Sequence, residues 1–181
     1  MSETSYDPQI HKNLASVYAG INEVDNAIKS AHIAQQSDDA NSVYESMYQE
    51  GLLELLRGNY RKGWRLTEAR LHYENNVSLA TTKVPYWDGK PLDDSQKLLV
   101  YQEQGFGDLL QFSRYLPLVK QRAGQVDLEV RANFHREDTT SSPKDFLAYN
   151  YPDINRVVVK GEKTHRYSDY DYIVSLMSLP Y

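Results

Sequence analysis

The chain has 181 residues, of which 40% are hydrophobic, and a formal net charge of -5. This content suffices for a packed core, and the length accommodates one medium domain or two small ones. Binding to nucleic acid or to an anionic membrane needs clustered Lys and Arg, so the acidic balance argues against both. Because the sequence contains no cysteine, it excludes disulfides, thiolate catalysis and cysteine zinc sites.

No segment of the sequence has the pattern of a targeting or membrane-spanning segment. Residues 1–9 are polar and acidic, and nowhere do about 18 apolar residues run together. We therefore expect a cytoplasmic protein without a membrane span. We also predict no metal site, because metal-ligand spacing is not found among the five histidines, His11, His32, His72, His135 and His165.

Apolar and small residues recur at helical spacing from about Pro8 to Tyr73, with turn signals every dozen or so residues. The pattern fits two tetratricopeptide-like helical hairpins. The residues at their packing positions are Leu14, Ala15, Tyr18, Ala27, Ala31 and Ala34 in the first copy and Gly51, Gly58, Tyr60 and Gly63 in the second. Small residues there let paired helices approach closely, and we expect Tyr18 and Tyr60 to fill the space between hairpins.

Two features depart from this repeat pattern. Asp38 and Asp39 stand where a proline is usual, and Thr67 and Arg70 occupy expected packing positions. A plain helical bundle therefore stays open as an alternative. Because about three repeats are usually needed to bury enough surface, we expect the two copies to pack on a further element.

Strand and helix signals alternate in the second half of the chain. We predict strands at 97–102, 126–130, 156–160 and 172–175, and a helix at 108–122. The apolar runs 98–100 and 157–159 are continuous, which is typical of strands covered on both faces in a parallel α/β sheet. The predicted organisation is therefore helical repeats at 1–77, a linker at 78–96 and an α/β lobe at 97–181.

A glycine-containing loop, residues 103–108, follows the first predicted strand and precedes the predicted helix. We expect Gly105 and Gly107 to take positive φ there, and the helix to offer free N–H groups and a positive dipole end to a ligand. A dinucleotide fingerprint needs a third small residue where Leu110 stands, and the Gly-Lys-Ser/Thr ending of a phosphate loop is lacking. We therefore predict no cofactor.

Several separate motifs carry a family resemblance. They are Gly58-Asn59-Tyr60-Arg61-Lys62-Gly63-Trp64 with Glu68 and Arg70, Pro85-Tyr86-Trp87-Asp88-Gly89, the run from Leu98 to Asp108, Gln111 to Pro117, Asp171-Tyr172, and Ser175 to Pro180. Together they resemble the bacterial and phage tetratricopeptide-repeat glycosyltransferases, relatives in fold of the heptosyltransferases. This resemblance spans most of the chain.

Such enzymes have two Rossmann-like lobes, of which the first tends to hold the acceptor and the second grips the nucleotide sugar. The chain stops at Tyr181, so the resemblance covers the N-terminal half only and implies a partial Rossmann-like acceptor lobe of a split or truncated sugar transferase. Whether the chain alone is an enzyme stays open. An acceptor glycan or glycosylated acceptor is the partner implied for this lobe.

The resemblance implies that Asp108 is the catalytic general base that deprotonates the acceptor hydroxyl. The alternative is that Asp108 only caps a helix beginning at Leu109. Substrate-binding roles are expected for Glu103 and Gln104, which follow the strand's carboxyl end, and for Gly105, Gly107 and Arg114.

A function without catalysis is the competing hypothesis. Tetratricopeptide-like arrays commonly bind a protein or peptide on one face, and here that face would include Asn13, Tyr18 and Tyr48. In this case the chain is a protein-interaction module.

Overall fold

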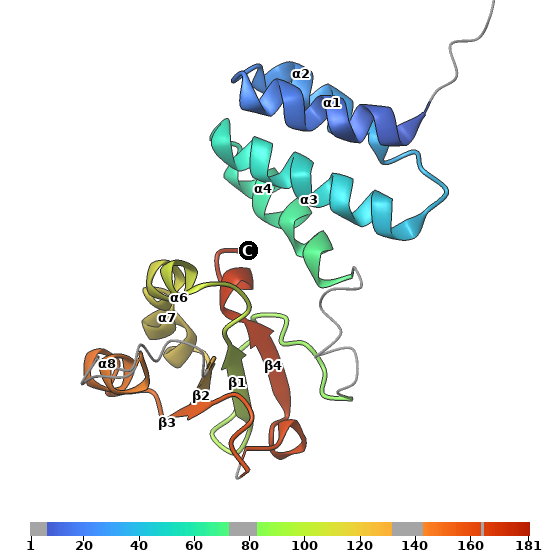
Figure 1. Cartoon of the computed structure of the whole chain (residues 1–181). Coiled ribbons are helices and arrows are strands. Elements are labelled where there is room, and N and C mark those ends of the chain that lie inside the picture. Colours follow the sequence, from blue (N-terminus) through green and yellow to red (C-terminus); the bar gives the residue numbers. More distant parts are fainter. Residues whose placement is uncertain (1–6, 73–82, 132–142, 164) are drawn as a thin grey trace, which may run out of the picture. The chain divides into compact units, whose positions relative to one another are not determined.

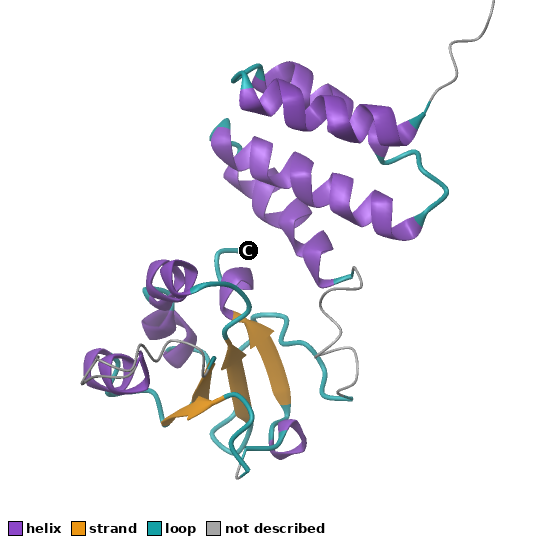
Figure 2. Ribbon diagram, in the orientation of Figure 1, coloured by secondary structure: helices purple, strands orange, loops and turns teal. Residues whose placement is uncertain are grey.

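The computed structural model describes residues 7–72, 83–131, 143–163 and 165–181. It divides the chain into two compact units, a helical unit (Met1–Ala80 with Tyr181) and an α/β unit (Thr81–Pro180). Helices come first and a parallel sheet with helices follows (Figures 1 and 2), so the predicted α + α/β fold class is confirmed. The predicted boundary between residues 77 and 78 lies outside the described residues.

Two helical hairpins build the helical unit. Its elements are α1 (Pro8–Gly20), α2 (Val24–Ala34), α3 (Ala40–Leu56), α4 (Tyr60–Thr67) and the 3-10 helix η1 (Glu68–Leu71). Helix α1 packs on α2, α2 on α3, and α3 on α4. Asp39, which departs from the repeat pattern, is the N-cap of α3, where its carboxylate accepts a hydrogen bond from the Ser42 N–H at 2.8 Å.

Small residues bring the paired helices together at most of the predicted positions, but not at Gly58, which is exposed in the turn after α3. Ala15, Ala27 and Ala31 are fully buried in the core of the unit, and Tyr18 packs partly buried against it. A Cβ on Gly51 would lie 2.8 Å from the Thr67 nitrogen, which is too close for any side chain. Helices α3 and α4 therefore need glycine at this crossing.

Tyr60 does not fill the space between hairpins, and that prediction is wrong. It is the first residue of α4, directly after the turn from α3, and its side chain is 64% exposed. Thr67 and Arg70 are buried instead, and Arg70 Nη1 bonds to the Thr67 carbonyl at 2.9 Å and to Glu68 Oε1 at 2.7 Å. The polar residues at these packing positions are therefore satisfied by local bonds.

Two buried carboxylates join α3 to α4. Lys62 Nζ lies 2.6 Å from Glu50 Oε1 and 2.8 Å from Glu54 Oε1, and Arg57 Nη2 lies 2.8 Å from Glu54 Oε2. Burial acts to raise the pKa of Glu54, but the hydrogen bonds from Lys62 and Arg57 outweigh it and hold the pKa below its ordinary value. These acids are tolerated inside because each is paired.

A four-stranded parallel sheet of order β3-β2-β1-β4 forms the α/β unit. Its strands are β1 (Lys97–Tyr101), β2 (Gln125–Val130), β3 (Arg156–Val159) and β4 (Tyr172–Ser175), and its helices are α6 (Phe106–Ser113), α7 (Leu116–Lys120), α8 (Pro143–Asn150), η3 (Tyr167–Asp169) and η4 (Leu176–Ser178). The four predicted strands are thus confirmed to within one residue at each end. Leu98, Val100 and Leu128 are fully buried, as expected for strands covered by helices.

The helix predicted at 108–122 is two helices, α6 and α7. It begins two residues earlier, at Phe106, and breaks after Ser113. Pro117 lies in the first turn of α7, where its missing N–H is tolerated. In one continuous helix Pro117 would have removed a bond to Ser113, so the break follows from the sequence.

Part of the predicted linker belongs to the α/β unit. The Ile173 N–H in β4 donates to the Pro85 carbonyl at 3.0 Å, and the Trp87 N–H donates to the Ile173 carbonyl at 2.8 Å. Residues 85–87 therefore lie along the outer side of β4 and cover that edge strand. In the described part of the chain, no helix is both long enough and apolar enough to cross a membrane.

Replacing Gly51 by alanine is expected to lower the free energy of unfolding of the helical unit by about 1–3 kcal/mol, because the added methyl overpacks the contact with Thr67. The matched control is Gly20→Ala at the end of α1, where a Cβ meets nothing within 4 Å. This control should be neutral or stabilising by up to about 1 kcal/mol. Urea unfolding followed by helical circular dichroism measures both, and equal effects would contradict the close crossing.

Candidate functional site

The glycine loop lies at the carboxyl edge of the sheet, beside the interior strand β1. Because all four strands are parallel, their carboxyl ends meet at this edge, which brings Glu103 after β1 close to Ser175 at the end of β4. Open α/β sheets place ligands outside the carboxyl ends of their strands. The predicted site residues of the loop, 103–108, therefore lie where such folds bind ligands.

The base of the loop is fixed to neighbouring strands. Glu103 is buried, and its Oε2 accepts a hydrogen bond from Ser175 Oγ at 2.6 Å. Gln102 donates from Nε2 to the Gln104 carbonyl and accepts the Arg131 N–H at Oε1, both at 2.9 Å. Gln102 and Ser175 were not predicted from the sequence, because each bonds to a residue that follows another strand, Arg131 after β2 and Glu103 after β1.

The tip of the loop is exposed, and its glycines do not adopt the predicted backbone. Gly105 has φ -68° and ψ 179° and is the N-cap of α6, while Gly107 lies inside that helix. Positive φ is found among the described glycines at Gly58, Gly89 and Gly161 only. The prediction of positive φ is wrong because an extended residue already leads the chain into α6.

Asp108 is the third residue of α6 and is partly exposed. Its Oδ2 accepts a hydrogen bond from the Gly105 N–H at 3.1 Å, so it reaches back over the first turn as a capping-box acid does. The cap of a helix beginning at Leu109 was thus predicted at the wrong position. One bond leaves room on the carboxylate, which has about four acceptor positions.

Arg114 is not brought to the loop. It is the C-cap of α6, nine residues after Gly105, and a rise of 1.5 Å per residue separates the two by about 13 Å. Its exposed guanidinium lies 5.1 Å from the centre of the Tyr115 ring and donates to the Tyr115 hydroxyl at 3.2 Å. The structure therefore groups residues 102–108 and leaves Arg114 at the other end of the helix.

A second polar cluster, which the sequence analysis missed, lies on one face of β2. The side chains of Glu129 and His165 are both nearly inaccessible, with His165 Nε2 2.7 Å from Glu129 Oε2. Tyr167 donates to the same oxygen at 3.0 Å. Burial, together with the charge of Glu129, raises the pKa of the Tyr167 hydroxyl. These bonds tie the segment 165–170 to the sheet.

Asp127 extends this cluster toward the amino edge of the sheet. Its Oδ2 accepts hydrogen bonds from the Tyr170 hydroxyl at 2.8 Å and from Arg156 Nε at 3.3 Å. Burial raises the pKa of Tyr170, and the bond to Asp127 adds to the effect. The hydrogen bond with Tyr170 raises the pKa of Arg156, as does the charge of Asp127. In the sequence, only the alternation of acidic and apolar residues along β2 indicated that Asp127 and Glu129 share one face of this strand.

A pocket of about 520 Å³ opens beside this cluster, at the amino edge of the sheet. Its lining residues are Lys97, Leu98, Gln125, Asp127, Asn155, Arg156, Asp169 and Tyr170. They come from the amino-terminal halves of β1 and β2, from the start of β3 with Asn155 just before it, and from the segment before β4. This amino-edge pocket is therefore at the opposite end of the strands from the glycine loop.

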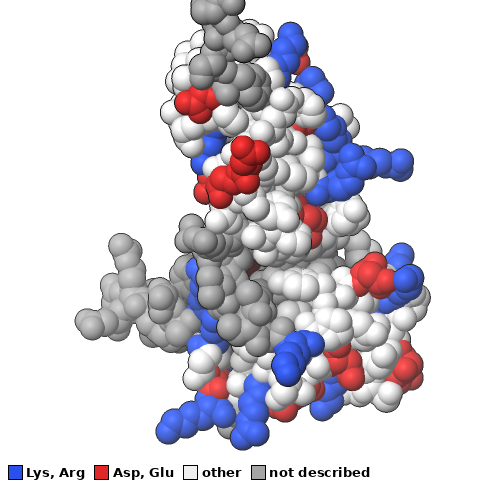
Figure 3. All heavy atoms as spheres, turned by 90° about the vertical axis from the view of Figure 1, so that its right-hand side faces the viewer, with Lys and Arg blue, Asp and Glu red and all other residues white. Residues whose placement is uncertain are grey.

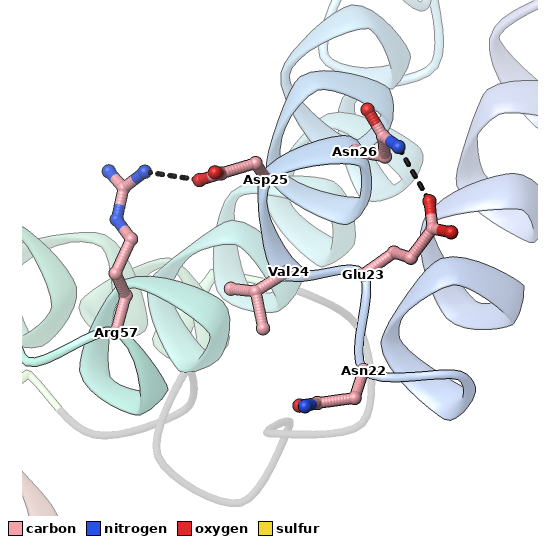
Figure 4. A pocket seen from close by; sticks show the side chains of 6 residues that line it. All are labelled: Asn22, Glu23, Val24, Asp25, Asn26 and Arg57. Atoms are coloured by element: carbon pink, nitrogen blue, oxygen red, sulfur yellow. Dashed lines mark hydrogen bonds and ion pairs between the residues drawn. The ribbon is translucent and has the colours of Figure 1, made fainter.

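The helical unit has a pocket of its own, of about 440 Å³. It is lined by residues 22–26, from the turn between α1 and α2, and by Arg57 at the end of α3 (Figure 4). Arg57 points to Asp25, with Nη1 3.0 Å from Oδ1, and Asn26 donates to Glu23 at 2.6 Å. The charged groups that line this pocket are thus already paired or hydrogen-bonded to one another or to Asn26.

Metal binding finds no support in the part of the chain that the structure describes, where no group of three or more His, Cys, Asp or Glu could hold an ion. Both signs of charge occur on each unit in the face that Figure 3 presents. Comparisons with protein-family models, with curated proteins and with solved structures found no match.

The stability of the α/β unit should fall as the pH rises above about 10, the ordinary tyrosine pKa. Tyr167 and Tyr170 have raised pKa values when folded, so the folded state keeps protons that the unfolded state releases there. Tyr170→Phe should make this decline shallower, whereas Tyr149→Phe, at an 86% exposed position, should not. Urea unfolding at a series of pH values tests this, and equal slopes in all three proteins would contradict it.

Proposed function

We propose that the chain is a glycosyltransferase-related protein whose α/β unit binds an acceptor sugar at the carboxyl edge of the sheet, with Asp108 as general base. One observation carries the proposal. A partly exposed carboxylate, Asp108, is held by the Gly105 N–H at the tip of a loop that follows an interior parallel strand. This combination supports proton abstraction from a ligand bound at the carboxyl edge of the sheet.

In the proposed sugar transfer, the main requirement on the protein is the position of the Asp108 carboxylate relative to the acceptor hydroxyl. Asp108 takes the proton of an acceptor hydroxyl as that oxygen attacks the anomeric carbon of the donor nucleotide sugar, and the bond from this carbon to the phosphate oxygen breaks, so that the nucleotide leaves with the bonding electron pair. Such a base contributes about 10²–10⁴-fold, and its oxygen must come within about 2.6–3.2 Å of the hydroxyl. The bond to Gly105 restrains the carboxylate, which reduces the ordering that substrate binding would otherwise require.

The rest of the loop supplies space and hydrogen-bonding groups. A Cβ on Gly107 would meet nothing within 4 Å, so the surface beside Asp108 is open to a sugar ring. Gln104 is exposed next to it, and Glu103 is held by Ser175 at the base of the loop. The proposal gives substrate contacts to this loop, while a contact from Arg114 would need a ligand that reaches along α6.

Two substitutions of Asp108 distinguish a role as general base from a role as helix cap. Asn keeps an oxygen that can accept the Gly105 N–H, whereas Ala removes it. A general base predicts that Asp108→Asn and Asp108→Ala both lose about 10²–10⁴-fold in transfer rate. A cap alone predicts that only Asp108→Ala loses stability, by about 0.5–2 kcal/mol, with no separate effect on a reaction.

The measurements are sugar-nucleotide turnover with an acceptor glycan panel, isothermal titration, and urea unfolding of each variant. Asp38→Asn is the control, because Asp38 is an exposed carboxylate in the helical unit. Absence of both glycan binding and turnover, alone and with a candidate donor-lobe chain added, would sink the enzymatic proposal.

A second function, protein or peptide binding by the helical unit, is favoured by an apolar stripe on α1. Ile10 and Val17 in α1 are 54% and 59% exposed, and their spacing of seven residues places them on one helix face; Ile21, the C-cap of α1, follows four residues later and is 62% exposed. Amphipathic partner helices bind to such faces through spaced apolar anchors.

Val17→Glu should abolish capture of a peptide or protein partner in a pull-down, because it places a charge in the middle of the α1 stripe. Gln36→Glu, at an exposed position after α2, makes the same charge change away from it. Asp108→Ala should leave capture intact. Loss with Asp108→Ala but not with Val17→Glu would assign the partner to the α/β unit instead.

A further inference from the structure

The amino-edge pocket has a balanced set of charges. Lys97 and Arg156 are cationic, and Asp127 and Asp169 are anionic. An anionic ligand would meet two carboxylates there, and a cationic ligand would meet two cations, so either charge is opposed as much as attracted. The lining therefore favours a ligand without net charge that both donates and accepts hydrogen bonds.

Three groups that line this pocket are joined by hydrogen bonds before any ligand binds. Asp127 holds the Tyr170 hydroxyl at 2.8 Å and Arg156 Nε at 3.3 Å, and Arg156 Nη2 lies 3.3 Å from the same hydroxyl. Tyr170 is buried, so its ring fixes the position of the three groups. A ligand that binds here would not have to order them, which lowers the cost of binding.

Two amides complete the lining with opposite hydrogen-bonding roles. Gln125 donates from Nε2 to the Asp94 carbonyl at 2.6 Å, and its amide oxygen is an acceptor. Asn155 accepts the Val126 N–H at 2.8 Å and Lys120 Nζ at 3.1 Å through its oxygen, which leaves its amino group as a donor. The pocket thus presents both an acceptor and a donor from neutral groups.

We propose that the amino-edge pocket binds a neutral polyhydroxylated molecule, such as a hexose ring. Each hydroxyl both donates and accepts, so a ring with adjacent hydroxyls can bridge Asp169 or Asp127 and the cations Lys97 and Arg156. The volume of about 520 Å³ lies within the range of small-molecule sites, about 300–1,000 Å³. This site is distinct from the Asp108 loop and does not rest on the proposed function.

The test is amide NMR of the full chain titrated with methyl α-D-glucopyranoside and methyl α-D-galactopyranoside, with zwitterionic glycine and anionic inorganic phosphate as comparison probes. The expected result is a saturable shift of the side-chain amides of Gln125 and Asn155 with a glycoside. Asp169→Ala should weaken this binding about tenfold, because it removes a charged acceptor at the rim. Asp38→Ala, an equal charge change at an exposed site in the helical unit, should leave it unchanged.

Each other outcome overturns the proposal. Glycoside shifts confined to residues 104–108 would assign sugar binding to the carboxyl edge and leave the Asp108 proposal standing. Shifts at Gln125 and Asn155 with glycine or phosphate alone would make the ligand a zwitterion or an anion, and not a neutral polyhydroxylated molecule. Equal binding by Asp169→Ala and Asp38→Ala, with unchanged circular dichroism in both, would also contradict it.

Discussion

The parallel pairing of β1 with β2 on one side and β4 on the other is the constraint on which the α/β unit depends. It aligns Leu98, Val100 and their neighbours into a covered layer and sends all carboxyl ends to one edge. The same register puts Lys97 opposite Gln125 at the other edge. One sheet therefore creates two separated polar surfaces, and each of them carries a proposal.

The structural role of the Asp108 carboxylate is compatible with the chemical role that we propose for it. A capping bond to Gly105 restrains an acid at the amino end of a helix, which is also what a general base requires. A cap buried on all sides could not act on a substrate. Partial exposure beside the open Gly107 makes the dual role physically consistent here.

The strands and helices could be predicted from the sequence because short stretches of neighbouring residues determine them. Continuous apolar runs identified the parallel strands, and small residues such as Ala15 and Gly51 identified close helix crossings. The prediction for Tyr60 was wrong because helical spacing indicates which side of a helix a residue lies on. It does not indicate that the residue is the first of α4, where the neighbouring hairpin does not cover it. The break at Pro117 was readable, since a proline cannot continue the helical bonding across it.

The site was less predictable, because its bonds join residues that the sequence keeps far apart. The loop position followed from the strand, but the holding of Glu103 by Ser175 crosses 72 residues. In β2, Asp127 and Glu129 read as the polar side of an alternating strand, which normally faces water. The segment 165–170 covers that side with hydroxyl and imidazole groups 36 to 43 residues away, which satisfies the two acids inside the fold. The sequence of β2 alone therefore does not show whether its acidic face is exposed to water or covered. That distinction depends on a distant polar segment, here residues 165–170, which packs on the face.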